Sequence, residues 1–318
     1  MLCILSATER NARGAVSVVI LTRNSARTLR QCLEGLEASR VKPAEVIVVD
    51  GGSTDETLNI VGEHSSSLNT KVLYDEGGGL GYARDIGWRE AGASSRYIAM
   101  IDSDVVIDPE FFSTAVKIMD LDEGLGALMG KLKSECNEKG LKAKFQVRNL
   151  SMALHIKDRP YPAASLSVST PCTLYRKEAL KEAGGFSDRY VLAKEDSYIA
   201  FKLRAMGYRL SVLNIYARHL ESGKRFWRVN FRYGRSYPVI AKDFPKEAPL
   251  WSIRNRVFVM AIALPFIQTF IVAWYFRRYL REVSLGPAEA LEMSMMETIR
   301  QLLRYSGMLY QYLKGGVD

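Results

Sequence analysis

An apolar run that ends in two acidic residues constrains the fold of this 318-residue chain more than any other feature. Residues 97–101 read Tyr-Ile-Ala-Met-Ile, and Asp102, Ser103 and Asp104 follow them. An uninterrupted apolar run of this length is typical of a strand buried on both faces of a parallel sheet. Because ligands bind at the carboxyl edge of open α/β sheets, the run predicts that both carboxylates lie at a binding edge. Two hard oxygen ligands there suit Mg²⁺ or Mn²⁺, ions that usually also hold a substrate diphosphate.

The segments around this run alternate between strand-like and helix-like patterns. Apolar, β-branched runs predict strands at 16–21, 45–49, 71–74 and 209–215. Capped or amphipathic segments predict helices after the first three of these strands, and a further helix at 175–183. Strands that alternate with helices predict the α/β class, with a mainly parallel sheet sandwiched between helices.

Polar residues follow the second strand at the same predicted edge. Asp50 ends that strand beside two glycines, so its carboxylate is expected to contact a base or a ribose; the alternative is a turn device. Ser53 and Glu56 have the spacing of a capping box, which predicts Ser53 as the N-cap of the next helix. For Asp55 we favour a role in the turn and cap.

A glycine-rich loop at 77–81 precedes the third helix. Its spacing is neither that of a P-loop nor that of the dinucleotide fingerprint after a first strand, so a dinucleotide-binding dehydrogenase is disfavoured. A loop that cradles phosphate and a merely flexible loop both stay open. Arg84, at the start of the following helix, is expected to reach a diphosphate; the alternative is a solvated side chain.

Three further side chains are candidates for chemistry. Glu195 and Asp196 open a predicted helix, where the helix dipole alone could account for two acids. The functional alternative is that one of them is a general base that deprotonates an acceptor hydroxyl. His219 follows a predicted strand and is either structural or a third metal ligand beside the Asp-x-Asp pair.

The charge of the chain favours acidic partners. It has 44 Lys and Arg against 35 Asp and Glu, a net charge of +9, which suits nucleotide diphosphates, anionic headgroups or nucleic acid. The four cysteines are scattered, so neither a zinc site nor a disulfide framework is indicated. The first fifteen residues lack the order of a signal peptide, and we expect the catalytic part to stay in the cytoplasm.

The last quarter of the chain differs in character. Residues 257–276 carry no charge, a length that matches the hydrocarbon core of a bilayer at about 1.5 Å per residue. With Pro265 near its middle, a single span and a re-entrant hairpin are both open; the alternative is a buried helix of a soluble fold. Residues 288–313 predict an amphipathic helix that suits interfacial packing or a dimer contact.

A basic and aromatic stretch precedes this apolar segment. Residues 224–237 interleave Phe, Trp and Tyr with five Lys and Arg. A nucleic-acid surface has such a composition, and a solvated basic face is the plain alternative. The position just before an apolar segment favours an interfacial helix that touches anionic headgroups or a lipid phosphate. We therefore expect a membrane partner and no nucleic acid.

Taken in order, these motifs resemble the family 2 glycosyltransferases, which have the GT-A fold. The resemblance runs from Val16 to His219, and the matching segments are 18–24, 45–57, 81–87, 102–104, 184–186, 195–196 and 207–209. It implies transfer of a sugar from a UDP- or GDP-linked donor to a hydroxyl or phosphate acceptor, with inversion at the anomeric carbon.

The resemblance also implies roles for individual residues. Asp196 is the expected catalytic base, with Glu195 beside it. Asp102 and Asp104, with His219 as a further ligand, are expected to hold a metal cofactor, Mn²⁺ or Mg²⁺. The residues expected to bind the donor are Thr22, Asn24, Asp50, Gly81, Arg84, Asp102 and Ser103.

Two departures from the family pattern qualify this expectation. Asp85 stands where family members often have Asn, which puts a donor contact from that position in doubt. The Gln-x-x-Arg-Trp signature of processive polysaccharide synthases is absent, so transfer of one sugar per encounter is expected.

Together these patterns predict a catalytic domain at 14–245 and a membrane-associated helical region at 246–318. The expected location is the cytoplasmic face of the cell membrane, and the expected acceptor is lipid-linked, either a polyprenyl phosphate or a lipid-linked glycan. The alternatives are a nucleotidyltransferase and a non-catalytic membrane scaffold that keeps the fold.

Overall fold

The computed structural model of the chain describes residues 14–135, 140–141, 144–145, 163–165, 167–186, 193–220, 226–246, 270, 272–281 and 284–314. The chain forms two compact units. Unit 1 comprises 1–135, 158–191 and 195–221, and unit 2 comprises 136–157, 192–194 and 222–318. Helix α10 (Phe226–Asp243) falls within the catalytic domain predicted at 14–245 but belongs to unit 2. The functional boundary at residue 245 stays a prediction.

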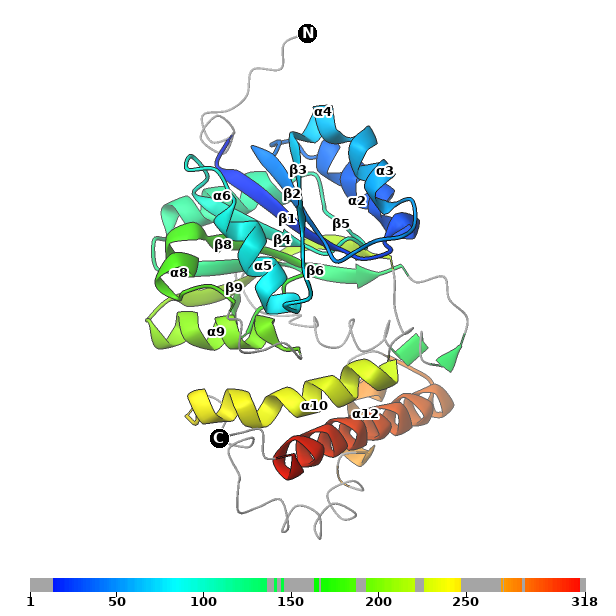
Figure 1. Cartoon of the computed structure of the whole chain (residues 1–318). Helices are drawn as coiled ribbons and strands as arrows, with labels where there is room; N and C mark the ends of the chain where they lie inside the picture. Colours follow the sequence, from blue (N-terminus) through cyan, green and yellow to red (C-terminus); the bar gives the residue numbers. More distant parts are fainter. Residues whose placement is uncertain are drawn as a thin grey trace. The chain divides into compact units, whose positions relative to one another are not determined.

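Four parallel strands form the first half of the sheet in unit 1 (Figure 1). They are β1 (Val16–Thr22), β2 (Glu45–Asp50), β3 (Thr70–Tyr74) and β4 (Tyr97–Ile101), in the order β3-β2-β1-β4. β2 and β4 are buried along their whole length, as continuous apolar runs predict. Because β2 and β4 lie on opposite sides of β1, the gap between β1 and β4 is a topological switch point, where open α/β sheets bind ligands.

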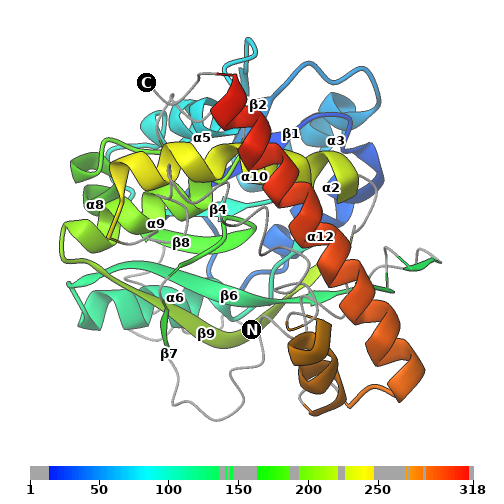
Figure 2. The same ribbon diagram turned by 90° about the horizontal axis from the view of Figure 1, so that it is seen from below.

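Helices cover both faces of these strands. Figures 1 and 2 show α5 (Leu80–Arg89) on one face and α2 (Ala26–Glu37) with α3 (Thr57–Glu63) on the other; the short α4 (Ser65–Leu68) follows α3. A Cβ atom on Gly87 of α5 would lie 2.4 Å from Cγ1 of Val19, and one on Gly35 of α2 would lie 2.7 Å from Cγ1 of Val106. Only residues without a side chain let these helices pack so closely on the strands.

The second half of the sheet is mixed. It contains β8 (Cys172–Arg176), β6 (Leu125–Ser134), β9 (Arg209–His219), β5 (Val105–Val106) and β7 (Ala163–Ser165). β8 runs antiparallel to β4 and β6, and β5 and β7 run antiparallel to β9, whereas β6 and β9 pair in parallel. The α/β class is confirmed, but the prediction of a mainly parallel sheet is wrong for this half.

The helices of this half are α6 (Phe111–Leu121), α8 (Lys177–Glu182) and α9 (Glu195–Ala205). The helix predicted at 175–183 begins only at residue 177, because Tyr175 and Arg176 belong to β8. Tyr175 lies on β8 between the neighbouring strands β4 and β6, and its ring is buried in the core of the unit.

The predicted capping box at Ser53 is not formed. α3 begins at Thr57, and the Ser53 hydroxyl donates to Oδ1 of Asp50 at 2.5 Å. Asp55 accepts hydrogen bonds from the amides of Thr57 at 3.1 Å and Ala26 at 3.2 Å, so its carboxylate joins the starts of α2 and α3. The turn-and-cap role favoured for Asp55 is therefore confirmed.

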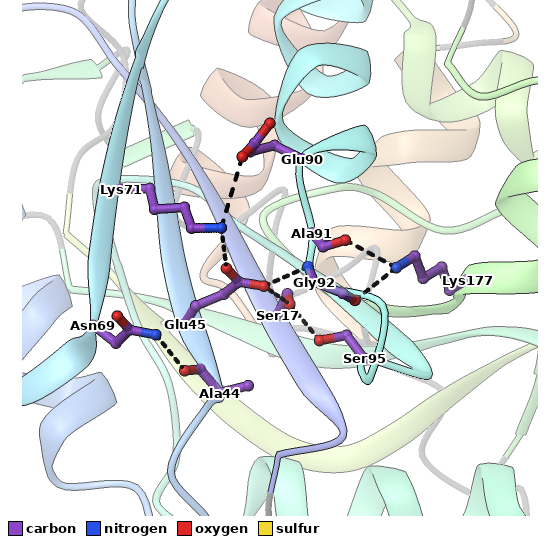
Figure 3. Close-up of polar contacts among 10 residues, drawn as sticks. All are labelled: Ser17, Ala44, Glu45, Asn69, Lys71, Glu90, Ala91, Gly92, Ser95 and Lys177. Atoms are coloured by element: carbon purple, nitrogen blue, oxygen red, sulfur yellow. Dashed lines mark hydrogen bonds and ion pairs between the residues drawn. The ribbon is translucent and has the colours of Figure 1, made fainter.

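A buried carboxylate secures the amino edge of the sheet, away from the predicted site (Figure 3). Glu45 accepts hydrogen bonds from the Ser17 hydroxyl at 2.7 Å and the Gly92 amide at 2.7 Å, and Nζ of Lys71 lies at 3.0 Å. Burial alone raises the pKa of Glu45, but these partners outweigh it and the pKa lies below its ordinary value. Lys177 donates to the carbonyl of Gly92 at 2.8 Å, so the network also holds the segment after α5.

Unit 2 is built around α10 and α12 (Pro287–Leu313), which cross in Figure 2. A Cβ on Gly234 would lie 1.8 Å from the carbonyl oxygen of Arg304, and one on Gly307 would lie 2.0 Å from that of Phe231. The backbones therefore meet at two glycines. The buried core beside this crossing contains Phe145, Phe226, Tyr279, Leu285, Ala290, Met293 and Met296.

The described residues include no helix that is long and apolar enough to cross a membrane. Most of the apolar segment at 257–276 falls outside them, since 257–269 and 271 are not described; residues 272–281 are helical. The amphipathic segment at 288–313 falls within α12. Membrane association stays a prediction at this point.

Candidate functional site

The residues predicted to bind a ligand gather at the carboxyl edge of unit 1, where β1, β2 and β4 end. Thr22 and Asp50 end β1 and β2 and pair in register, and Asp102 follows β4 directly. The edge therefore brings together three segments that are far apart in the sequence, at the switch point of the sheet.

The carboxylate of Asp50 accepts four hydrogen bonds, from the end of β1 and from the turn after β2. The hydroxyls of Thr22 and Ser53 donate to its Oδ1 at 2.9 and 2.5 Å, and the amides of Gly52 and Ser53 donate to its Oδ2 at 3.0 and 2.8 Å. The residue is 1% exposed. Burial raises the pKa of this carboxyl, but the hydrogen bonds outweigh burial and lower the pKa below its ordinary value. The turn role is thus present in the structure, and contact with a nucleoside stays a prediction.

Asn24 ties the loop after β1 to the loop after β2. Its backbone is left-handed, with φ of 52°, and its amide donates to the Ser53 hydroxyl at 2.9 Å. Its side-chain Oδ1 accepts from the amide of Thr54 at 2.8 Å. Ser103 makes a similar link, since its hydroxyl donates to that of Ser25 at 3.0 Å. Both residues shape the rim of the edge, and their donor contacts stay predictions.

The carboxylate of Asp75 fixes the start of the glycine-rich loop. Oδ1 of Asp75 accepts hydrogen bonds from the amides of Gly77 at 3.0 Å and Gly78 at 2.9 Å, so these two amides are already used. Gly79, with φ of 91°, precedes α5, and Gly81 lies buried in its first turn. This arrangement favours a turn over a phosphate cradle at the first two glycines.

Arg84 is buried at the centre of the site, and the alternative of a solvated side chain is wrong. Its Nη2 donates to the Thr170 hydroxyl at 2.7 Å and lies 3.2 Å from Oε1 of Glu195 and 3.6 Å from Oδ1 of Asp102. The guanidinium thus joins α5, the end of β4 and the start of α9. Thr170 carried no signal in the sequence, because a lone threonine in an irregular segment has no recognisable pattern.

The charges of this cluster depend on one another. Burial is the largest influence on Arg84 and lowers its pKa, but the negative charges of Glu195 and Asp102 outweigh it and raise the pKa. Burial raises the pKa of Glu195, and the guanidinium of Arg84 opposes that rise. Glu195 is 5% exposed, and its pKa lies above the ordinary value because burial outweighs the charge of Arg84.

Asp196 is the more accessible acid of the pair. It is half-buried in the first turn of α9, and its Oδ1 accepts hydrogen bonds from the amide and the hydroxyl of Ser197 at 2.6 and 3.3 Å. Its neighbour Glu195 is committed to Arg84. The geometry therefore distinguishes the two acids: Glu195 is a buried partner of Arg84, and Asp196 is partly exposed.

Strand pairing brings His219 to the Asp-x-Asp segment. Val105 of β5 pairs with His219 of β9, which leaves Nε2 of His219 3.5 Å from Oδ2 of Asp104. Nδ1 of His219 is buried without a hydrogen-bond partner in the described part of the chain. Among the described residues, no group of three His, Cys, Asp or Glu side chains is gathered tightly enough to hold a metal. The carboxylates of Asp102 and Asp104 are the kind of donor that suits Mn²⁺ or Mg²⁺, and the role of His219 as a further ligand stays a prediction.

Asp85 has a structural role that the sequence did not reveal. Its Oδ1 accepts hydrogen bonds from Nε1 of Trp88 at 2.7 Å and from the amide of Phe186 at 2.8 Å. A Cβ on Gly185 would lie 2.2 Å from the same oxygen. Residues 184–186, Gly-Gly-Phe, are one of the segments that match the family pattern. They form a turn that wraps around the Asp85 carboxylate.

Comparison with known proteins places these features in a family. The family model described as "Glycosyl transferase family 2" matches residues 17–184. The chain is 36% identical over 98 residues to "Putative glycosyltransferase EpsH" of Bacillus subtilis (strain 168), covering 30% of this chain and 28% of that protein. It is 27% identical over 202 residues to "Poly(ribitol-phosphate) beta-N-acetylglucosaminyltransferase TarS" of Staphylococcus aureus (strain Mu50), covering 62% of this chain and 34% of TarS. The match therefore spans about a third of the length of these relatives.

Solved structures agree on the fold. TarS 1-349 of S. aureus in complex with UDP superposes with a TM-score of 0.52 at 21% identity, covering 94% of this chain and 91% of that one. The mannosyltransferase PcManGT from Pyrobaculum calidifontis, in complex with GDP-Man and Mn²⁺, superposes with a TM-score of 0.63 at 19% identity, covering 95% and 88%. At these identities the likeness establishes the GT-A-like α/β fold.

Proposed function

This chain belongs to glycosyl transferase family 2, as its motifs predicted, and we propose that it transfers a single sugar from a nucleotide-diphosphate donor to a lipid-linked acceptor. The observation that carries the proposal is the Arg84 cluster. It holds the first acid of the Asp-x-Asp pair and the start of α9 at one sheet edge, so a donor diphosphate and an attacking acceptor can meet there. The relatives support a nucleotide-sugar donor, since the TarS and PcManGT structures contain UDP and GDP-Man.

The proposed donor site lies at the ends of β1, β2 and β4. The loops joined by Asn24 and Asp50 flank the nucleoside, and Arg84 and Ser103 face the diphosphate. Asp102, Asp104 and His219 would hold a divalent ion, Mn²⁺ or Mg²⁺, which neutralises charge on the departing nucleoside diphosphate. The buried guanidinium of Arg84 beside Asp102 also stabilises the negative charge that develops on the departing nucleoside diphosphate, because a positive charge acts strongly in a low-dielectric site.

The acceptor is activated at the start of α9. Asp196 takes the proton from an acceptor hydroxyl while the oxygen attacks the anomeric carbon, and the configuration inverts. Glu195, held by Arg84, keeps the first turn of α9 in place. An acceptor phosphate is already ionised and needs little help from a base, so Asp196 then orients the acceptor.

The proposed acceptor and the proposed location rest on the composition of two segments of the sequence. The composition of 224–237 and of 257–276 supports a polyprenyl phosphate or a lipid-linked glycan as acceptor, at the cytoplasmic face of the cell membrane. The lack of a processive signature supports one sugar per encounter.

A donor screen with the full chain tests this function. The protein in detergent is incubated with UDP- and GDP-sugars, Mn²⁺ and a polyprenyl phosphate, and released nucleoside diphosphate is measured together with the mass of the lipid. A lipid that gains one sugar, with loss of this product in Asp104→Ala and retention in the exposed-acid control Glu123→Ala, supports the proposal.

The rival functions give different products in the same assay. Release of pyrophosphate in place of a nucleoside diphosphate identifies a nucleotidyltransferase. No turnover of any donor by the folded protein contradicts the enzyme proposal and favours the scaffold. Transfer only to water-soluble acceptors, with or without lipid, contradicts the lipid-linked acceptor.

A further inference from the structure

One side of α12 is apolar along its length and exposed. Leu291, Met295, Leu302, Leu309 and Leu313, which we call the α12 outer stripe, are between 40% and 79% exposed. Their spacings of four, seven, seven and four residues place them within about 40° of one another around the helix. From the first to the last the stripe is about 33 Å long, at about 1.5 Å per residue. Single exposed leucines are normal, but five exposed apolar side chains on one side of a helix mark an interaction surface.

The stripe is not the side of α12 that packs in unit 2. The opposite side carries Gly307 at the crossing with α10, and Gln311, which accepts a hydrogen bond from Nε of Arg235 at 3.1 Å. Charged groups of α12 also lie off the stripe: Arg300 pairs with the buried Glu297, and Arg304 donates to Oδ1 of Asn230 at 3.0 Å. The helix therefore packs one side against the rest of unit 2 and exposes a second side, on which the stripe residues are uncharged.

Cations and exposed aromatic rings accompany the stripe within the same unit. Arg228 and Arg232 are exposed on α10, the helix that α12 crosses. Trp227 on α10 and Trp274 in the helical segment 272–281 are each about half exposed. Exposed Trp beside Arg on helices that also present leucines is the composition of a surface that binds at the boundary between headgroups and acyl chains.

We propose that the α12 outer stripe lies flat in the surface of an anionic lipid bilayer, with Arg228 and Arg232 contacting the headgroups. Charge selects this occupant. The stripe offers no charge of its own for an ion pair with a protein partner, while the basic residues of the same unit match anionic lipid. The inference rests on the proposed function in naming its membrane partner, and it assigns the surface that brings a lipid-linked acceptor to the enzyme.

Vesicle binding by the full chain tests this surface. Cosedimentation is measured with phosphatidylcholine vesicles and with vesicles that also contain about 30% phosphatidylglycerol. We expect preference for the anionic vesicles, and a loss of about tenfold or more in their binding by the double variant Leu302→Glu/Leu309→Glu. The matched control is Leu121→Glu/Met206→Glu, which makes the same change at two exposed apolar positions of unit 1 and should bind as the unaltered protein does.

The basic residues are tested separately from the stripe. Arg228→Gln/Arg232→Gln should lose about thirtyfold in binding to anionic vesicles and little in binding to neutral ones, since each of the two cations near such a surface contributes about 1 kcal/mol. Lys42→Gln/Lys117→Gln, which removes two exposed cations of unit 1, is the control. Circular dichroism of each variant verifies that it is folded.

Other results overturn the proposal. A lipid-free dimer that becomes monomeric in Leu302→Glu/Leu309→Glu assigns the stripe to a second copy. Vesicle binding that the stripe variant retains in full assigns the membrane contact elsewhere, and absence of binding with a monomeric protein means that the chain covers its own stripe. Donor turnover measured without vesicles tests the proposed function independently, so failure of one is distinguishable from failure of the other.

Discussion

Arg84 connects acids that the sequence places far apart. Asp102 follows it by 18 positions and Glu195 by 111, yet both lie within 3.6 Å of the same guanidinium nitrogen. The sequence marked each of the three as a candidate, because each stands at the end of a strand or the start of a helix. It could not give their pairing, since a guanidinium on one helix has many carboxylates of the chain within conceivable reach.

Removing Arg84 should destabilise unit 1 strongly. Arg84→Gln leaves Glu195 buried without its counter-charge, and breaking a buried pair in this way costs about 3–5 kcal/mol. Urea unfolding measures the loss. Arg30→Gln removes one partner of an exposed pair, Arg30 with Glu63 at 2.6 Å, and should change stability much less. An equal effect of the two substitutions would show that Glu195 does not depend on Arg84.

Glu45 should make stability depend on acid. Its pKa in the folded protein is lowered from an ordinary value of 4.5, so its stabilising contribution is present above that value and is lost as the pH falls through the lower, folded pKa. Glu45→Gln should therefore be less stable than the unaltered protein at about pH 7, and the difference should shrink at about pH 3. Urea unfolding at both pH values measures it; a difference independent of pH would contradict the assigned network.

Some strands could be predicted from their residues and others could not. β1, β2 and β4 are buried on both faces, so their continuous apolar runs are visible in the sequence. β5 has two residues and β7 three, too few for any periodicity to be detected. Yet β5 is the strand that brings His219 to Asp104. The candidate metal ligands could thus be named from the sequence, but only long-range pairing gives their proximity.

The glycine crossing of α10 and α12 should tolerate no side chain. Gly307→Ala places a methyl group where the carbonyl of Phe231 lies, so the helices must separate, at a cost of about 1–3 kcal/mol or more. The neighbouring exposed position supplies a control, since Ser306→Ala should leave stability unchanged or raise it slightly through helix propensity. Thermal unfolding followed by circular dichroism distinguishes the two variants; equal stability would show that the helices do not meet as closely as described.

The site and the proposed membrane surface belong to different units of the chain. The described residues of the Arg84 cluster and of the Asp104–His219 pair are all in unit 1, whereas the α12 outer stripe is in unit 2. The motifs of unit 1 predicted the family and the fold. For unit 2 the sequence showed only composition and amphipathicity. Neither identifies the partner of a helix, because an amphipathic helix suits a lipid surface and a protein partner alike.

Separate units should allow the two activities to be separated. Leu302→Glu/Leu309→Glu should hydrolyse a donor sugar in solution at the normal rate, because no altered residue belongs to the site. The same variant should transfer sugar to a polyprenyl phosphate in anionic vesicles about tenfold more slowly. Parallel measurement of nucleotide release and lipid mass gives both rates. Loss of soluble hydrolysis would show that the stripe is needed for the catalytic fold itself.

The path of the chain between the units limits how such a protein can change over time. Phe145, from a short excursion of the chain, contributes to the core of unit 2 beside Phe226, although most of unit 2 follows residue 221. A second excursion, 192–194, ends one residue before Glu195. A single recombination event at the end of the gene could therefore neither add unit 2 nor replace it with another domain. The three segments of unit 2 must be inherited together with the catalytic unit that they interrupt.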